Sequence, residues 1–329
     1  MRVDPIGSSA ERYVQLLDLA CHAGHAESCI ALAEAVTHAP GLPRDDARAA
    51  AAYEAGCALG DGAACLNRTG DDVFAGAKSA TTAEHLARAR AALTAGCDAR
   101  VGRSCGVLAV IIGLIDGDRE RESLLEQEAA TLLTGECEGG VADRCEMAAR
   151  ELDRLGSRDH SDEISRLLHR GCALGAGRSC MMLVGDESPF GDPALTAADR
   201  AQLERAACTR GRAAGCLALD QAHPEPALFA RGVALAEAAC ALGLDDSCEV
   251  VARLLESSAL SAGDATRLDA LATRACEHHD PLVCNALADA LDHGPVARRD
   301  SGRVAELKLH ACTWGYPFAC PSPDAAMRQ

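Results

Sequence analysis

Eighteen cysteines follow one spacing along this chain of 329 residues, and no cysteine falls outside it. Each first cysteine is followed by a second one eight residues later, a C-x7-C pair, and the first cysteines recur at intervals of 32 to 40 residues. Such a period indicates a repeat protein. The nine predicted disulfide pairs are Cys21 with Cys29, Cys57 with Cys65, Cys97 with Cys105, Cys137 with Cys145, Cys172 with Cys180, Cys208 with Cys216, Cys240 with Cys248, Cys276 with Cys284 and Cys312 with Cys320.

The residues around each pair predict a helical hairpin. An Ala-, Leu-, Glu- and Arg-rich stretch precedes the first cysteine, and an apolar stretch such as Ile30–Ala33 follows the second. In seven pairs a glycine three residues after the first cysteine favours a left-handed turn at a helix end, whereas Arg100 and His279 stand there in two others. The next helix then starts at a polar or small residue such as Asp61 or Asp245. Two helix ends that meet at a tight turn bring the sulfurs within disulfide reach.

The predicted fold class is therefore all-α, a superhelical α/α solenoid of about nine two-helix repeats. We expect one continuous domain over residues 1–329, with caps at about 1–20 and 300–329. Aromatic residues make up only 2% of the chain, so the core must consist of Ala, Leu and Val. Each disulfide would close a loop of about nine residues, which contributes about 2.5 kcal/mol in the chain-entropy model.

Charge and hydropathy exclude several partners. The net charge of −17 argues against nucleic acid, because phosphate binding needs a basic surface, and it favours a basic protein or peptide. The longest apolar run, Val107–Ile115, is too short to span a bilayer. We expect a monomer without a cofactor.

The even number of cysteines indicates a disulfide framework and an oxidising compartment, periplasmic or extracellular. The first residues, Met1–Pro5, contain no signal-peptide h-region. We therefore expect that a signal peptide has been removed and that Met1 is not the natural start. The alternative is a cytoplasmic protein with reduced thiols, acting in redox chemistry or metal binding.

Three stretches carry a resemblance to a known family. A-C-x-x-G at a helix end with a second cysteine eight residues on, Gly41–Asp45 followed by Ala52-Tyr53 and Cys57, and, more loosely, Gly294–Asp300 before Cys312 match its pattern. Over residues 10–325 the chain resembles the sel-one-like repeat (SLR) family, relatives of tetratricopeptide repeats, in the disulfide-bridged form of the Helicobacter cysteine-rich proteins.

This resemblance implies a superhelix with a concave groove that binds a protein or peptide, in an adaptor, secretion-linked or immunity-type role. It also implies an alternative, because some cysteine-rich members are penicillin-binding proteins or weak β-lactamases. The S-x-x-K motif of serine β-lactamases is absent, since Ala75 and Ala305 stand three residues before the two lysines. Gly102–Gly106 matches G-x-S-x-G, but a helical stretch precedes it, so we interpret Ser104 as a helix-start residue. We predict no catalytic residue.

Histidines and aromatics offer weaker candidates. His22 and His25, like His278 and His279, lie near cysteines, but they do not recur from repeat to repeat, so we predict turn histidines and no metal site. Trp314, Tyr316 and Phe318 gather in the last pair. They are predicted to seal the end of the solenoid, with a recognition patch as the alternative.

Partner contacts are expected from the helices that follow each second cysteine, together with the last aromatic residues. The predicted partner-binding residues are Arg68, Glu146, Arg150, Glu249, Arg253, Asn285, Asp289, Trp314 and Tyr316.

Overall fold

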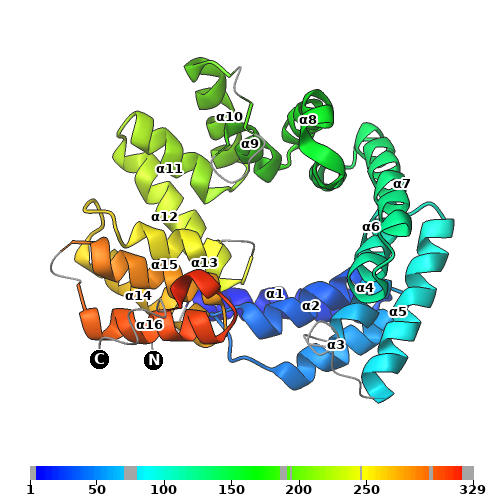
Figure 1. Ribbon diagram of the computed structural model, residues 1–329. Coiled ribbons are helices and arrows are strands. Elements are labelled where there is room, and N and C mark those ends of the chain that lie inside the picture. Colours follow the sequence, from blue (N-terminus) through cyan, green and yellow to red (C-terminus); the bar gives the residue numbers. More distant parts are fainter. Residues whose placement is uncertain are drawn as a thin grey trace. The chain divides into compact units, whose positions relative to one another are not determined.

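The computed structural model describes residues 5–69, 80–185, 191–192, 195–244, 247–295 and 299–320. Over these ranges the regular secondary structure is helical, and consecutive helices form hairpins (Figure 1). The α-helices are α1 (Pro5–His22), α2 (Ala26–His38), α3 (Asp46–Ala58), α4 (Gly62–Asn67), α5 (Ala80–Asp98), α6 (Gly102–Ile111), α7 (Arg119–Glu138), α8 (Ala142–Leu174), α9 (Gly177–Val184), α10 (Ala197–Thr209), α11 (Ala213–Ala222), α12 (Pro226–Ala241), α13 (Ser247–Leu254), α14 (Ala262–Glu277), α15 (Pro281–His293) and α16 (Ser301–Thr313).

A disulfide joins the two arms on either side of each C-x7-C turn, as the spacing predicts, and each such pair of arms is called a hairpin below. All eighteen cysteines are paired, and the Cα atoms of each pair lie 4.5–4.8 Å apart. The bonds join Cys21 to Cys29, Cys57 to Cys65, Cys97 to Cys105, Cys137 to Cys145, Cys172 to Cys180, Cys208 to Cys216, Cys240 to Cys248, Cys276 to Cys284 and Cys312 to Cys320. The nine predicted pairs are therefore confirmed.

The cysteines occupy the expected places in the hairpins. The first cysteine lies in the last turns of one helix and the second in the first turns of the next. The ninth hairpin differs, because its second arm consists of the 3-10 helix η4 (Pro317–Ala319), which ends directly before Cys320. Each of these hairpins is an all-α repeat closed by a C-x7-C disulfide.

The turn between the arms has the left-handed residue that the glycines predict. Gly60, for example, has φ +89°; its N–H bonds the Cys57 carbonyl at 3.0 Å, and the next N–H bonds the Gly56 carbonyl at 3.1 Å. This pattern satisfies the free carbonyls of a helix end. Arg100 and His279, which replace the glycine, adopt the same conformation with φ of +63° and +67°.

The predicted helix starts are confirmed only in part. Asp61 accepts a bond from the Ala64 N–H at 3.0 Å and caps α4 as expected. Val101 and Val141 occupy the same place before α6 and α8, although they offer no capping side chain. For α6 the following hairpin supplies the acceptor instead, because Glu136 bonds the Gly102 N–H at 3.2 Å. Asp245 lies outside the described residues.

The residues that directly precede the two cysteines of a pair face each other across the hairpin. A Cβ on Gly96 would lie 2.8 Å from the Ser104 Cβ, and a Cβ on Gly171 would lie 3.0 Å from that of Ser179. Such distances leave room for a side chain at one of the two facing positions, so the other position must hold a small residue.

The fourth hairpin differs from the hairpins just described at these two facing positions. Both facing positions carry long side chains, Glu136 and Arg144, and these form an ion pair at 3.0 Å. The second helix of this hairpin and the first helix of the next run together as α8, with a kink at Gly156, where φ is +125° and ψ is +98°.

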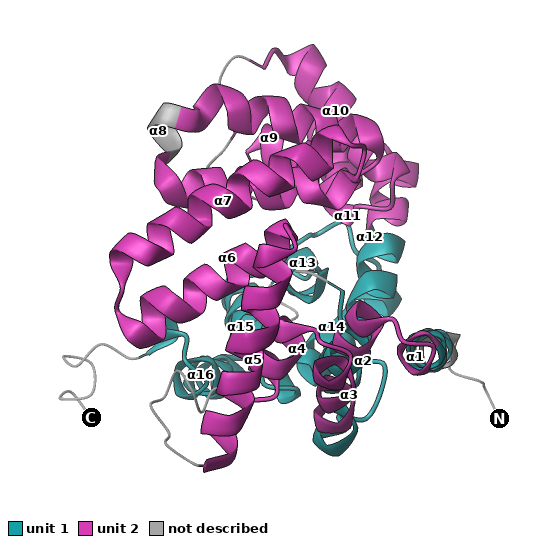
Figure 2. Cartoon of the chain, turned by 90° about the vertical axis from the view of Figure 1, so that its right-hand side faces the viewer, with its two compact units in different colours: residues 1–19, 31–49, 233–329 teal, residues 20–30, 50–232 magenta. Residues whose placement is uncertain are grey.

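The chain forms two compact units (Figure 2). Unit 1 comprises residues 1–19, 31–49 and 233–329, and unit 2 comprises residues 20–30 and 50–232. Within unit 1 the early segment contacts the late repeats, since the Gly41 N–H bonds the Ala241 carbonyl at 3.1 Å and Arg44 bonds the His278 carbonyl at 2.9 Å. That one domain spans the whole chain stays a prediction.

Within unit 2, each helix from α4 to α11 packs against the next one along the chain. The core consists of Ala, Leu, Ile, Met and the disulfides themselves, with Cys105, Cys137 and Cys145 fully buried. This composition agrees with the scarcity of aromatic residues. Within the described part of the chain, every helix is too short or too polar to cross a bilayer.

Candidate functional site

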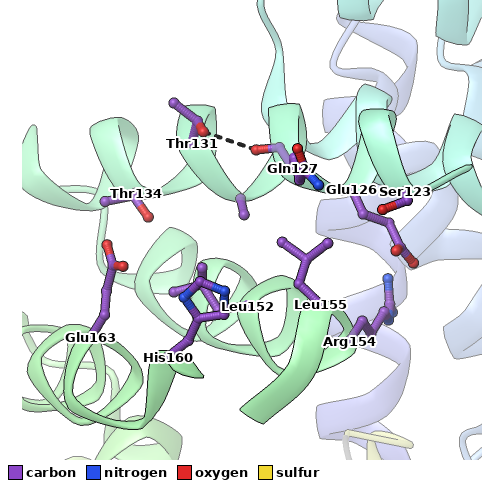
Figure 3. A pocket seen from close by; sticks show the side chains of 11 residues that line it. Ser123, Glu126, Gln127, Thr131, Thr134, Leu152, Arg154, Leu155, His160 and Glu163 are labelled. Carbon is purple, nitrogen blue, oxygen red and sulfur yellow. Dashed lines mark hydrogen bonds between the residues drawn. The ribbon is translucent and has the colours of Figure 1, made fainter. Parts of the chain in front are cut away.

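A cleft of about 630 Å³ lies between α7 and α8 in unit 2 (Figure 3). Helix α7 lines it with uncharged polar side chains spaced four, four and three residues apart, which places them on one face of the helix. The opposite side of α7 packs Ala129, Leu133 and Cys137 into the core. The polar residues of α7 on the cleft are Ser123, Gln127, Thr131 and Thr134.

Both arms of the kinked α8 contribute to the other wall. Leu152 and Leu155 precede the kink at Gly156, and His160 and Glu163 follow it. In Figure 3 the two leucines lie in the middle of the cleft, with His160 and Glu163 towards one end. The kink therefore gives the cleft an apolar floor and a polar end.

Several polar groups of the cleft are free to bind a ligand. Ser123, Thr134, His160 and the side-chain amide of Gln127 make no hydrogen bond or ion pair with other described residues. Among the uncharged side chains of α7 on the cleft, the Thr131 hydroxyl donates to the Gln127 carbonyl at 2.9 Å. Free donors and acceptors of this kind are hydrated in an empty cleft, and a ligand that offers matching groups replaces the water.

The other end of the cleft carries opposite charges. Burial and then the nearby Glu122 carboxylate raise the pKa of Glu126 above its ordinary value. Arg154 lies at the same end and is held by the buried Glu151, whose two oxygens both lie 2.9 Å from its Nη1. Gly106 makes room for this carboxylate, since a Cβ there would lie 3.0 Å from Glu151 Oε1. The guanidinium is thus positioned by a second residue outside the cleft.

Several of the predicted partner-binding residues pair with each other along a single helix. Glu146 pairs with Arg150 at 3.0 Å and with Arg178 at 3.3 Å. Glu249 pairs with Arg253 at 2.9 Å, one turn along the same helix. These charged side chains have intramolecular partners.

The other predicted partner-binding residues also lie outside the cleft between α7 and α8. Asn285 and Asp289 bond each other at 3.0 Å, and Lys308 bonds their oxygens at 2.7 and 2.6 Å. Arg68 ends α4. The cleft between α7 and α8 is lined by none of the nine residues, and their role in binding stays a prediction.

The aromatic residues of the last hairpin form a small cluster. Trp314 packs against the rings of His279 and His310, with centroids 4.5 and 5.0 Å apart. Tyr316 contacts Phe318 edge to face at 5.5 Å, while Phe318 remains 86% exposed. That this cluster caps the repeat stack stays a prediction, with partner binding as its alternative.

Sequence reasoning missed the cleft because it considered only the helices after each second cysteine. The signal was nevertheless present. Over Arg119–Glu138 the sequence is otherwise charged, apolar or glycine, so the uncharged polar stripe described above stands out at helical spacing. The contribution of α8 had no such signal, because it depends on the single kink at Gly156.

Two further candidates receive structural explanations. Ser104 follows helix α5 and a turn, a context unlike the strand that a nucleophile elbow needs, and it packs against Gly96. The Sγ atoms of Cys97 and Cys105 and a carboxylate oxygen of Glu128 lie within 4.8 Å of one another, as metal ligands would. These two sulfurs are bonded to each other, so they offer no thiolate to a metal.

The comparisons with known proteins add resemblances to solved structures. No family model matches the chain, and no curated protein does. The chain is similar to the protective antigen c5321 of uropathogenic Escherichia coli, a structure described as displaying an SLR fold, with 14% identity and a TM-score of 0.33 over 93% of this chain. It spans 65% of the length of that chain. It is also similar to a Sel1 repeat protein from Oxalobacter formigenes, with 12% identity and a TM-score of 0.38, over 96% of this chain and 92% of that one.

The class that the fold defines is a helical repeat protein with a disulfide in each described hairpin. Nine disulfides favour an oxidising, extracytoplasmic location.

Proposed function

We propose that this chain is an exported repeat scaffold, monomeric and built as one continuous solenoid, that binds a peptide segment of a partner protein in the cleft between α7 and α8. One observation carries the proposal. The side chains of Ser123, Gln127 and Thr134, which have no partner among the described residues, face an apolar floor in a cleft of about 630 Å³.

The dimensions suit an extended segment. Ser123 and Thr134 lie eleven residues apart on α7, which corresponds to about 16 Å along the helix axis. An extended chain of about five residues covers that length. The side-chain amide of Gln127 offers donors and an acceptor to the peptide backbone, and Leu152 and Leu155 offer apolar contact to its side chains.

Charge favours a basic segment. Glu126 lies at one end of the cleft and Glu163 towards the other, Arg154 beside Glu126 is already bonded to Glu151, and the chain as a whole has a net charge of −17. Attraction of a basic partner speeds association and weakens with salt. The selected peptides should therefore contain Lys or Arg and bind less tightly at higher ionic strength.

Selection from a displayed library of random decapeptides on the full oxidised chain tests the proposal. The Gln127→Ala and Thr134→Ala double variant removes two hydrogen-bonding groups and should weaken the selected peptides by about 30-fold, at about 1 kcal/mol for each bond. Gln202→Ala, which changes an exposed glutamine on α10, is the matched control. Equal affinity for the double variant, or failure to select any sequence, would show that the cleft is not a peptide site.

A further inference from the structure

A second cavity of about 510 Å³ lies in unit 2 where the first turns of α2, α4, α6 and α8 meet. Its walls include two large apolar side chains, Leu59 and Val101, which are 48% and 45% exposed. Its polar lining includes Glu27, Arg103 and Arg144. Four different hairpins thus contribute to one groove that combines exposed apolar surface with two guanidinium groups.

The carboxylate of Glu27 already forms ion pairs with both arginines. Glu27 Oε1 lies 3.2 Å from Arg103 Nη1 and 3.4 Å from Arg144 Nη2. The Glu27 side chain is nevertheless 66% exposed, whereas the Arg103 and Arg144 side chains are 31% and 18% exposed. The two arginine side chains are therefore largely buried in the wall of the groove, whereas the Glu27 side chain that contacts them is largely exposed.

The position of Arg144 is unusual among the hairpins. Its counterparts before a second cysteine include Ser104 and Ser179, which fit against a glycine. Arg144 is accommodated by Glu136 at 3.0 Å, and it also lies 3.4 Å from the exposed Asp143. The ion pair with Glu136 satisfies the hairpin, so the further contact of Arg144 with Glu27 is not needed to close it.

We propose that this groove binds an acidic side chain, Asp or Glu, of a partner peptide, and that Glu27 is an internal competitor for the same two arginines. The proposal deepens the peptide-binding function proposed above by adding a second site of stated chemistry. It uses residues separate from the cleft between α7 and α8.

The competition is physically feasible because Glu27, one partner of both ion pairs, is 66% exposed. Water and salt screen an ion pair whose partner is exposed, and this weakens it. An incoming carboxylate replaces Glu27 without loss of hydrogen bonds, and apolar residues beside it cover Leu59 and Val101. The net negative charge of the chain opposes an acidic peptide only weakly, since charges beyond about 8 Å are screened at physiological ionic strength.

Fluorescence anisotropy with capped heptapeptides tests the proposal. Each peptide is acetylated and amidated, with Glu, Gln or Lys at the centre between varied apolar residues, so that the central Glu is the only carboxylate. A fourth set has Gln at the centre and a free terminal carboxylate. The protein is the full oxidised chain.

Three results are expected. Glu27→Gln should bind the Glu peptides about 5-fold more tightly than the natural chain does, which is the effect of removing a competing ion pair of about 1 kcal/mol. Arg103→Gln should weaken the same peptides about 10-fold, since it removes a charge-assisted hydrogen bond. Neither change should alter binding of the Gln or Lys peptides.

Control variants separate this site from general charge effects. Glu138→Gln and Arg166→Gln break an exposed ion pair of 3.0 Å elsewhere in unit 2 and should leave binding of the Glu peptides unchanged. Circular dichroism of every variant checks that the helices remain folded.

The opposing outcomes are distinct. Glu peptides that bind Glu27→Gln and the natural chain equally, or that bind neither, would overturn the proposal, and so would a preference for the terminal carboxylate. Failure of this site leaves the cleft between α7 and α8 untouched, because the Gln127→Ala and Thr134→Ala variant tests that cleft with other peptides.

Discussion

At the scale of single residues, the turn position three places after the first cysteine is where backbone conformation restricts side chains most. Gly211 is left-handed with φ +86°, and nothing lies within 4 Å of the place where its Cβ would stand. Arg100 is forced into the same region at φ +63° by the hairpin around it. A side chain at such a position costs about 1–2 kcal/mol in backbone energy.

Substitutions at Arg100 and Gly211 should change the free energy of unfolding in opposite directions. Arg100→Gly should raise the free energy of unfolding by about 0.5–1 kcal/mol, because relief of strain exceeds the added entropy of the unfolded chain. Gly211→Ala should lower it by about 1 kcal/mol. Urea denaturation of the oxidised chain measures both, and a stabilising Gly211→Ala would contradict this account.

This part of the structure was predictable residue by residue, because a glycine at constant distance from a cysteine identifies the turn. The helix starts were less predictable. Val101 has no capping side chain, and the acceptor at the start of α6 comes from Glu136 of the next hairpin. A contact between hairpins cannot be read from local sequence.

Buried Glu151 provides a pH-dependent prediction at the same scale. Burial raises its pKa above the ordinary value, against a smaller opposing effect of Arg154. The folded state therefore holds a proton that the unfolded state has lost, and this contribution to stability declines as pH rises from about 4.5 through the raised pKa. Glu151→Gln should become more stable relative to the natural chain between pH 4 and pH 7.

Chemical denaturation at several pH values checks this. Glu138→Gln, at an exposed carboxylate, controls for the loss of one negative charge. A difference between Glu151→Gln and the natural chain that stays constant with pH would show that the ionised carboxylate is well accommodated beside Arg154.

At the scale of the element, a hairpin is specified by its disulfide, its turn and the pair of residues that face each other before the two cysteines. Ala207 faces Gly215, with 2.7 Å between the Ala207 Cβ and the place of a Gly215 Cβ, which is the reverse order of Gly171 and Ser179. The hairpin therefore restricts the combined volume of the two facing side chains, whichever arm carries the smaller residue.

The pair of Gly171 and Ser179 tests this rule. Gly171→Ala would place its Cβ 2.5 Å from Ser179 Oγ and 2.9 Å from Cys145 Cβ, so overpacking should cost about 1–3 kcal/mol. Adding Ser179→Gly should recover part of that loss. Thermal denaturation of both single variants and the double variant gives the coupling between the two positions, and additive effects would refute the rule.

At the scale of the element, only part of the structure was predictable from the sequence. The hairpins, their order and their disulfides followed from spacing and helix-end chemistry. The cleft did not, because it depends on the kink at Gly156, where two predicted helices run together within α8. A single glycine gives no indication of how far the following arm will turn.

At the scale of the whole molecule, the nine disulfides predict that the protein is isolated in its oxidised form. Each bond removes two hydrogens, so the intact mass without reductant should lie about 18 Da below that of the fully reduced chain. Alkylation before reduction should label no cysteine, and alkylation afterwards should label eighteen. Free thiols before reduction would support the alternative of a cytoplasmic thiol protein.

Each disulfide spans a sequence separation of only eight residues. Eighteen cysteines allow on the order of 10⁷ pairings, yet the native ones are always to the nearest cysteine in sequence order. Short loops close fastest, so a chain that enters an oxidising environment from its N-terminus can form each correct bond before the next cysteines arrive. Such a protein should depend little on disulfide isomerases during its maturation.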